Sequence, residues 1–198
     1  MHKFNFPTTI YYGKDSLDAL ARVIKEKHHK RILLVTDQTL IDVGLSQKVM
    51  SALKEHSPYQ SVSIHFSVFS DIHKNPIEQD VQAGADQYIK EKCDAIIALG
   101  GGAPMDVAKG IKVLSRHEGP ISRYEESQGG DQYIVHPMPT LYAIPTTAGT
   151  GSEVGRSAVI ILKNTGQKSV IFHPALMPDI AVLHPPLTQG LPPDITAA

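Results

Sequence analysis

The chain has 198 residues, 41% of them hydrophobic and 20% charged, a composition typical of a globular protein large enough to bury a core. Its 19 basic and 20 acidic residues give a formal charge of −1 without blocks of like charge, so we expect neither nucleic acid nor a membrane as partner. The one cysteine, Cys93, cannot form an intramolecular disulfide, and no apolar run has the length of a signal peptide or a membrane span, so we expect a cytoplasmic protein.

Short apolar runs alternate with helical patterns in the first third of the chain. Residues 31–37 (RILLVTD) are apolar and β-branched, which predicts a strand. Residues 39–56 place apolar side chains four apart, which predicts one helix. Residues 61–69 (SVSIHFSVF) alternate between apolar residues and serine or histidine, which predicts a strand with one buried face.

A further helix and two further strands follow. Residues 75–93 carry apolar residues at helical spacing, with Asn75 as the expected N-cap and Pro76 in the first turn. Residues 94–100 (DAIIALG) and 141–145 (LYAIP) are continuous apolar runs, which predict strands covered on both faces. This order predicts an α/β fold with a Rossmann-like, mainly parallel sheet flanked by helices.

Two segments depart from this alternation. SAVIIL and KSVIF flank the turn KNTGQ, whose Asn164 and Gly166 can take positive φ, so residues 157–172 are expected to form a β-hairpin appended to the sheet. Residues 115–140 combine glycine, proline and charge with little periodicity, which predicts an exposed connection with one short turn of helix at most. No linker composition marks a boundary, so residues 1–198 are expected to form one domain.

Three consecutive glycines, residues 100–102, lie between the strand at 94–100 and a helix expected to start near Pro104. Such a junction directs free backbone N–H groups and the positive end of the helix dipole at the carboxyl edge of the sheet. Phosphate binds well there, and glycine lets it approach without a Cβ in the way. The alternative is a turn that only needs positive φ.

The glycines do not follow the usual dinucleotide-binding order, in which G-x-G-x-x-G comes after the first strand and an acid after the second. Here Asp37 ends the first strand, and the glycines come after the third. An acid at that place can accept hydrogen bonds from a ribose diol, so both elements are present in reversed order. Asp37 could instead cap the helix that follows it.

A second polar segment, IPTTAGTGSEVGRSAVI at 144–160, follows the fourth strand. Thr146, Thr147, Thr150 and Ser152 offer small hydroxyl groups suited to a pyrophosphate or a nicotinamide amide. The alternative is a polar loop that only connects strand and hairpin. A serine-hydrolase nucleophile elbow is excluded, because positions 150 and 154 are threonine and valine where that motif needs glycine.

GGGAPMDVAK, PTTAGTGSEV and the ending PDIAVLHPPLTQGLPPDITAA together resemble the N-terminal domain of the iron-containing (group III) alcohol dehydrogenases. The likeness extends over essentially the whole chain. Members of that family transfer hydride between an alcohol or aldehyde and NAD(P), and they hold a divalent metal, usually iron, in a second, helical domain.

The resemblance implies a cofactor-binding set, in which Asn75 would line the cofactor cleft: Asp37, Asn75, Gly101, Gly102, Ala103, Met105, Asp106, Thr146, Thr147, Thr150, Lys168 and Leu187. Asp37 would contact the adenosine ribose and favour NAD over NADP by repelling a 2′-phosphate. The pyrophosphate would be surrounded by Gly101, Gly102, Ala103, Met105 and Asp106. The phosphate or nicotinamide side would be approached by Thr146, Thr147 and Thr150. Lys168 would reach the nicotinamide ribose, and Leu187 the adenosine half.

The chain departs from the family pattern in a few positions and in its length. Ala103 stands where serine is common, Gly155 and Arg156 replace threonine and a smaller residue, and His184 replaces a common aspartate. The family's all-helical metal-binding domain is missing, so we expect a truncated chain. The ten histidines show no metal-ligand spacing, so neither iron nor zinc is expected in this chain, although both occur in full-length enzymes of the family.

Two functional hypotheses follow. In the first, the chain is the cofactor-binding half of an alcohol dehydrogenase, inactive alone because the reaction with a small alcohol or aldehyde needs the absent domain. In the second, it is a non-catalytic dinucleotide-binding or assembly module. In either case we expect a homodimer or self-association, through exposed apolar surface and the β-prone N-terminal run TTIYY.

Overall fold

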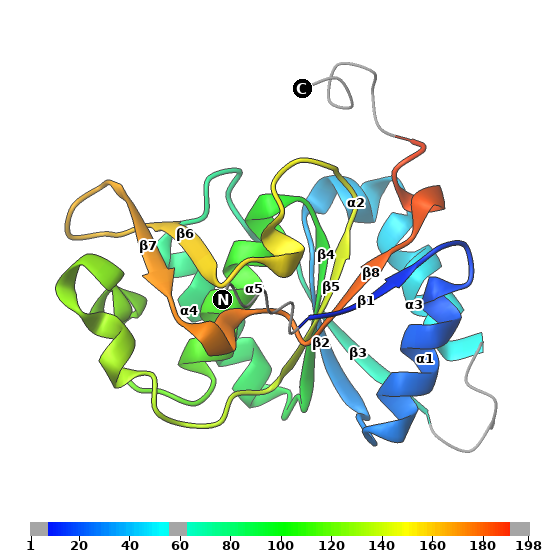
Figure 1. Cartoon of the computed structure of the whole chain (residues 1–198), viewed down its shortest axis with the longest axis horizontal. Helices are drawn as coiled ribbons and strands as arrows, with labels where there is room; N and C mark the ends of the chain where they lie inside the picture. Colours follow the sequence, from blue (N-terminus) through cyan, green and yellow to red (C-terminus); the bar gives the residue numbers. More distant parts are fainter. Residues whose placement is uncertain (1–7, 56–62, 191–198) are drawn as a thin grey trace, which may run out of the picture.

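The centre of the fold is a six-stranded parallel sheet, seen in a computed structural model that describes residues 8–55 and 63–190 (Figure 1). The strands lie in the order β1-β8-β5-β4-β2-β3. Their bounds are β1 Thr9–Tyr12, β2 Arg31–Val35, β3 His65–Phe69, β4 Ala95–Gly100, β5 Thr140–Pro145 and β8 Ile180–Leu183. The predicted Rossmann-like α/β fold is confirmed.

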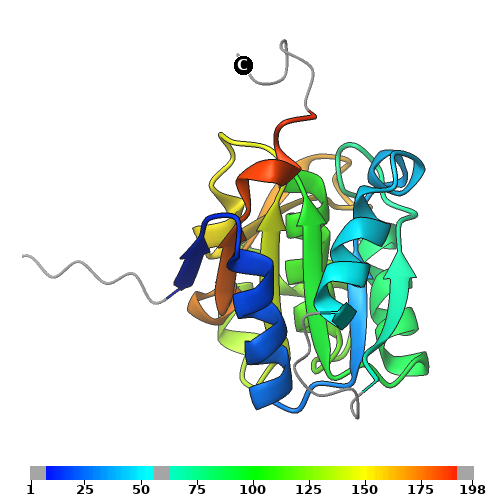
Figure 2. The same cartoon turned by 90° about the vertical axis from the view of Figure 1, so that its right-hand side faces the viewer.

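Helices cover both faces of the sheet. Helices α4 (Glu78–Lys90) and α5 (Gly102–Leu114) lie on one face, and α1 (Ser16–Glu26) and α3 (Leu45–Glu55) lie on the other (Figure 1 and Figure 2). The short helix α2 (Gln38–Asp42) precedes α3. Across the described parts of the chain, no helix combines the length and the apolar character that a membrane span requires.

Alternate residues of the central strands enter two separate cores. On β2, Leu33 and Val35 pack with α4 and α5, whereas Ile32 and Leu34 pack with α1 and α3. All four side chains are fully buried. This burial on both faces explains why the strand is a continuous apolar run in the sequence.

The winding of the chain reverses between β2 and β4, which are neighbours in the sheet. From β2 the chain passes through α2 and α3 to β3 at the edge, returns through α4 to β4, and continues through α5 to β5 on the other side. The pairing of Val35 with Ala98 sets the carboxyl ends of β2 and β4 side by side. Ligands of open α/β sheets bind in the crevice at such a reversal.

Two helix predictions in the first half of the chain are wrong in detail. The helix expected over residues 39–56 is interrupted at Gly44, whose φ of +74° lies outside the α region, so α2 and α3 are separate. Helix α4 begins at Glu78 with Ile77 as its N-cap, two residues later than the Asn75 cap predicted. The cap is set by Asp80, whose Oδ2 accepts from the Ile77 N–H at 3.1 Å.

Strand β3 has no fully solvated face, which corrects the prediction for residues 61–69. Phe66 and Val68 are half-buried against the α1–α3 core, as their side of the pattern predicted. On the other side Ser67 and Phe69 are also buried, because α4 covers that side of the strand. Residues 61 and 62 of the prediction lie outside the described part of the chain.

The predicted hairpin is present as β6 (Ser157–Ile161) and β7 (Lys168–Phe172), which pair in antiparallel register. It forms a two-stranded sheet of its own beside α5 and does not extend the parallel sheet (Figure 1). In its turn Gly166 takes the expected positive φ, of +66°, whereas Asn164 does not.

Residues 115–140 are more structured than predicted. They contain three short 3-10 helices: η1 (Ile121–Tyr124), η2 (Glu126–Gln128) and η3 (Gly130–Tyr133). Ile121 and Tyr124 are buried in the core, and the Tyr124 hydroxyl donates to the Glu118 carbonyl at 2.6 Å. The expected exposed connection is therefore wrong, because a few apolar anchors hold this polar segment against the protein.

Candidate functional site

The glycine segment makes a tight turn between β4 and α5. Gly100 ends β4 with φ of +144°, which residues with a Cβ rarely adopt, and its carbonyl accepts from the Thr146 N–H at 3.1 Å. Gly101 is the N-cap of α5 and has no side chain with which to bond the free amides of the first turn. The turn therefore presents backbone N–H groups and the positive end of a 13-residue helix at the carboxyl edge of the sheet.

The loop after β5 lies directly against this turn. A Cβ on Gly101 would lie 3.1 Å from Thr147 Oγ1, and a Cβ on Gly102 would lie 3.4 Å from Thr150 Cγ2. Because Gly101 and Gly102 have no side chains, a narrow space remains between the glycine turn and the two threonines, and any side chain on the turn would reduce it. Free amides, a helix N-terminus and small hydroxyls around such a space fit the diphosphate of a dinucleotide.

A pocket of about 320 Å³ opens beside the turn. Its lining residues are Lys74, Asn75, Pro76, Gly102, Ala103, Asp106, Thr150, Val159, Ile161 and Lys168. Six of these belong to the predicted cofactor-binding set, and they come from the segment before α4, the start of α5, the loop after β5 and the hairpin. Lys74 and Lys168 are exposed and add positive charge suited to an anionic ligand.

Asp106 is the acid of this pocket and is held by two hydrogen bonds. Its Oδ1 accepts from the Ser152 hydroxyl at 3.0 Å, and its Oδ2 accepts from the Val159 N–H at 3.2 Å. Burial raises the pKa of the Asp106 carboxyl, and the nearby Lys109 ammonium and both hydrogen bonds oppose that rise. Asp106 therefore faces the pocket in an orientation fixed by the loop after β5 and by β6.

Asp37 lies after β2, the strand that pairs with β4 in the sheet. Its Oδ1 accepts from the Leu40 N–H at 2.9 Å, so it is the N-cap of α2. The capping role that the sequence left open is thus present. A carboxylate has about four lone-pair positions, so the cap leaves acceptor capacity for a ribose hydroxyl.

Met105, Thr146 and Leu187 of the predicted set are buried. Met105 packs in the core under α5, and Leu187 packs in the core formed with α1 and α3. Thr146 is 3% exposed at the end of β5. We therefore expect these three side chains to pack beneath the backbone of the site and not to contact the cofactor.

A second pocket, of about 360 Å³, lies at the same end of the sheet. It is lined by Tyr12, Pro145, Thr147, Ala148, Gly149, Glu153, Leu183, His184, Pro185 and Thr188. His184 replaces an aspartate that is common in the family that the sequence resembles, and its Nδ1 bonds to the Ser16 hydroxyl at 3.1 Å. Because Thr147 borders this pocket and Thr150 the first, the loop after β5 contributes to both.

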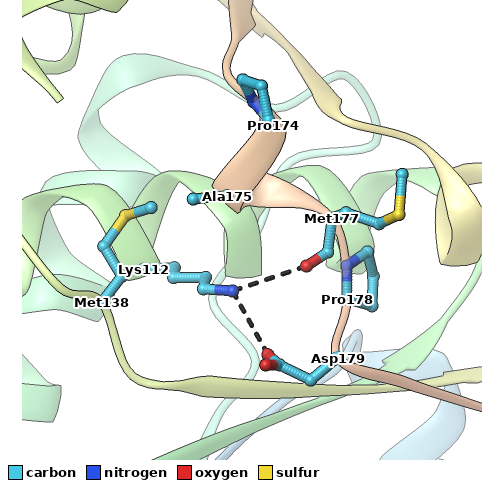
Figure 3. Close-up of a pocket in the computed structure, with 7 residues that line it drawn as sticks. All are labelled: Lys112, Met138, Pro174, Ala175, Met177, Pro178 and Asp179. Atoms are coloured by element: carbon cyan, nitrogen blue, oxygen red, sulfur yellow. Dashed lines mark hydrogen bonds and ion pairs between the residues drawn. The ribbon is translucent and has the colours of Figure 1, made fainter. Parts of the chain in front are cut away.

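A third pocket, of about 280 Å³, lies at the opposite end of the sheet (Figure 3). Lys112 and Asp179 form an ion pair there at 3.3 Å, and the Lys112 ammonium also approaches the Met177 carbonyl at 3.5 Å. Asp179 precedes β8 and accepts from the Leu141 N–H at 2.9 Å, which closes the amino ends of β5 and β8. This ion pair is structural and lies away from the glycine turn.

Metal ligation does not fit the described residues. Within residues 8–55 and 63–190, no three histidine, cysteine, aspartate or glutamate side chains are grouped so that they could hold a metal ion. Two histidines have other partners: His29 Nδ1 bonds the Tyr142 hydroxyl at 2.9 Å, and His73 Nδ1 bonds Asp80 Oδ1 at 2.8 Å.

Two lysines near the pocket are not in the cofactor-binding set predicted from the sequence. Lys109 is fully buried behind Asp106, and Lys74 lines the pocket beside Asn75. A signal for Lys109 was present, because it is a charged residue about one helical turn after Asp106 in a largely apolar helix. Lys74 carried no such signal, since exposed lysines are common.

Comparison with known proteins gives consistent matches. The family model described as iron-containing alcohol dehydrogenase matches residues 7–185. The 4-hydroxybutyrate dehydrogenase of Cupriavidus necator is 40% identical over 169 residues, which are 85% of this chain and 42% of that protein. Alcohol dehydrogenase 4 of Schizosaccharomyces pombe is 38% identical over 195 residues, which are 98% of this chain and 44% of that protein.

Solved structures are similar over the whole chain. A 1,3-propanediol oxidoreductase matches with a TM-score of 0.87 at 31% identity, covering 99% of this chain and 49% of that one. A sulfoacetaldehyde reductase from Bifidobacterium kashiwanohense, solved in complex with NAD+, matches with a TM-score of 0.83 at 30% identity, covering 100% of this chain and 50% of that one. The chain spans about half the length of the curated relatives it matches.

Proposed function

The chain belongs to the iron-containing alcohol dehydrogenase family, and from this premise we propose that it is the nicotinamide-nucleotide-binding half of an NAD-dependent alcohol dehydrogenase. One observation carries the proposal: the pocket beside the glycine turn gathers six of the predicted cofactor residues from four separate segments. NADP is less favoured than NAD, because Asp37 at the neighbouring strand end would repel the 2′-phosphate of NADP.

The residues of the chain would bind and orient the nucleotide. The amides of Gly101 and Gly102 would hold the diphosphate at the N-terminus of α5, while Thr147 and Thr150 would close over it. Lys168 at the start of β7 would reach a ribose from the hairpin side of the pocket. When bound, NAD supplies the hydride acceptor, and the chain determines where the nicotinamide lies.

The substrate class is a proposal drawn from the relatives. Two of them are named for 4-hydroxybutyrate and 1,3-propanediol, both small molecules with a primary hydroxyl group. We propose a small alcohol or the corresponding aldehyde as substrate of the whole enzyme. The 198 residues alone are expected to be inactive, and the cytoplasmic location likewise stays a prediction.

Pairing with a second copy is also proposed. Strand β1 is at the edge of the sheet, with β8 of the same chain on its inner side. On β1 Ile10 is 47% exposed and Tyr12 is 78% exposed. Among the residues that the structure describes, no strand pairs with the outer edge of β1, and this edge with its exposed apolar residues supports a homodimer formed along β1.

Titration calorimetry tests the proposed function. We expect heat of binding with NAD, weaker binding with NADP, and lower affinity at higher salt, because the ligand is anionic. Absence of binding to both nucleotides by a chain shown to be folded by circular dichroism would refute the proposal. In a parallel assay with added iron or zinc, NAD and an alcohol, NADH formation would contradict the expected inactivity of the chain alone.

A further inference from the structure

A buried lysine lies directly behind the nucleotide pocket. Lys109 on α5 is 0% exposed, and its ammonium donates to the Ser152 hydroxyl at 2.8 Å and to the Ser157 carbonyl at 2.8 Å. Ser152 belongs to the loop after β5, and Ser157 begins β6. One ammonium therefore joins the helix of the glycine turn to the threonine loop and to the hairpin.

The direction of these hydrogen bonds is fixed by chemistry. An ammonium group can only donate, and an ionised carboxylate can only accept. The Ser152 hydroxyl accepts from Lys109, so its single hydrogen must point to Asp106 Oδ1, at 3.0 Å. The two hydrogen bonds thus run in one direction, from the buried Lys109 through Ser152 to Asp106 at the wall of the pocket.

The positive charge of Lys109 affects how an anionic ligand can bind beside Asp106. Asp106 lines a space that we propose receives a diphosphate, and a carboxylate beside a diphosphate is repulsive. A buried ammonium next to the carboxylate offsets that repulsion, and burial makes the compensation stronger than it would be in water.

We propose that Lys109 is a positioning residue for the nucleotide site, which acts through Ser152 to fix the orientation and the charge of Asp106 and to hold the threonine loop against the glycine turn. This inference rests on the proposed function. Nucleotide would not touch Lys109 itself, because its ammonium is fully enclosed.

The titration of Lys109 provides a distinctive readout. The pKa of Lys109 is lowered to about 8, mainly by burial and in smaller part by the Lys112 charge, while Asp106 and Glu153 oppose this fall. A bound diphosphate would raise this pKa, so the affinity for nucleotide should be greatest below pH 8 and should fall as the pH rises through about 8 and the ammonium loses its proton.

Lys112 is a matched control on the same helix. It is 4% exposed, and it is paired with Asp179 at the opposite end of the sheet (Figure 3). Lys112→Met removes a buried cation from α5 just as Lys109→Met does, but it does so away from the nucleotide pocket. A general loss of stability would affect both variants, whereas a positioning role affects only Lys109→Met.

The first experiment measures NAD affinity of the 198-residue chain by calorimetry between pH 6.5 and 9.5. We expect Lys109→Met to lower the affinity about tenfold and to flatten its pH profile, since a charge-assisted hydrogen bond is lost. Ser152→Ala should lower it about threefold, and the double variant should resemble Lys109→Met, because the two residues act in series. Lys112→Met should stay within about twofold of the parent affinity at low pH and should keep the fall in affinity with pH, displaced slightly to higher pH because the Lys112 charge lowers the pKa of Lys109.

The second experiment needs no nucleotide and separates this inference from the proposed function. Carbon-13 NMR of the Asp106 carboxyl should show its pKa rising in Lys109→Met and in Ser152→Ala and unchanged in Lys112→Met. An unaltered Asp106 titration in Ser152→Ala, or equal NAD affinities of Lys109→Met and Lys112→Met, would overturn the inference. A parent chain that does not bind NAD would instead refute the proposed function, and should Lys109→Met fail to fold, Ser152→Ala decides.

Discussion

Alanine in place of Gly101 tests whether the glycine turn holds a diphosphate. Gly101 is the N-cap of α5, and a Cβ there would enter the space next to Thr147. Gly110 lies in the middle of the same helix, where a Cβ would instead meet Val81 in the core, at 2.7 Å. We expect Gly101→Ala to weaken NAD binding without unfolding the chain, and Gly110→Val to lower stability without changing the affinity.

The expected changes in the free energy of unfolding follow from the surroundings of Gly101 and Gly110. Gly101 has φ of −86° and ψ of −154°, an extended conformation with negative φ, so reduced freedom of the unfolded chain contributes about 0.4–1 kcal/mol of stability once the Thr147 side chain, 3.1 Å from the new Cβ, shifts slightly. Loss of a favoured N-cap residue costs a similar amount, roughly 1 kcal/mol, and the net change is small. Gly110→Val overpacks the contact with Val81 and Ile160, which costs about 1–3 kcal/mol.

The affinity term concerns Gly101 alone. A methyl group at this position removes room for at least one hydrogen bond between a backbone N–H and a charged phosphate oxygen, worth about 1.5–3 kcal/mol. The NAD dissociation constant should therefore rise by about ten- to hundredfold, since 1.4 kcal/mol corresponds to a factor of ten.

Calorimetric titration with NAD and thermal unfolding of both variants check this reasoning. For a chain of this size, the Gly110→Val cost corresponds to a fall in Tm of about 2–12 °C, and Gly101→Ala should leave Tm within a few degrees of the parent. Unchanged NAD affinity in Gly101→Ala would show that phosphate does not approach the turn. A large fall in Tm for Gly101→Ala would show that the glycine is required by the fold instead.

Two further predictions concern Asp37 and Cys93. Asp37→Ser keeps a residue favoured as N-cap of α2 but removes the charge, so we expect unchanged stability and an NAD-over-NADP preference about tenfold smaller in parallel titrations; an unaltered preference would exclude Asp37 as the discriminating residue. Burial raises the pKa of the Cys93 thiol to about 11, so alkylation at pH 8 should be about a hundredfold slower in the folded chain than in the unfolded chain, and equal rates would contradict that burial.

The parallel sheet could be predicted from sequence because its strands are buried on both faces. The runs ending at Val35, Gly100 and Pro145 are continuous and apolar, and helical spacing between them leaves few alternatives to an α/β fold. Helix boundaries were less accurate, because the N-cap of α4 depends on the Asp80 side chain three residues later and not on the residue type at Asn75. The 3-10 segments were missed since two or three buried anchors do not produce a period.

The parts of the site that depend on local backbone were also predictable. Consecutive glycines and a cluster of threonines are visible as motifs, and parallel strands deliver both to one edge of the sheet. What sequence could not provide is the direction of individual side chains. Met105 lies one residue before Asp106 and points into the core, and the bonds that join Lys109 to Ser152 and Ser157 span 43 and 48 positions of the chain.

The reversed order of glycines and acid is explained by the sheet itself. A dinucleotide crevice needs a glycine turn on one strand and an acid on the strand beside it, and it needs them where the winding of the sheet reverses. Here Asp37 follows β2 and the glycines begin at the end of β4. The two strands are hydrogen-bonded neighbours although α2, α3, β3 and α4 lie between them in sequence. The last paired residues of the two strands, Val35 and Ala98, each lie two residues before these elements, Asp37 and Gly100. The acid and the glycine turn can therefore hold one ligand because their strands are adjacent in the sheet, whatever the order of the two motifs along the chain.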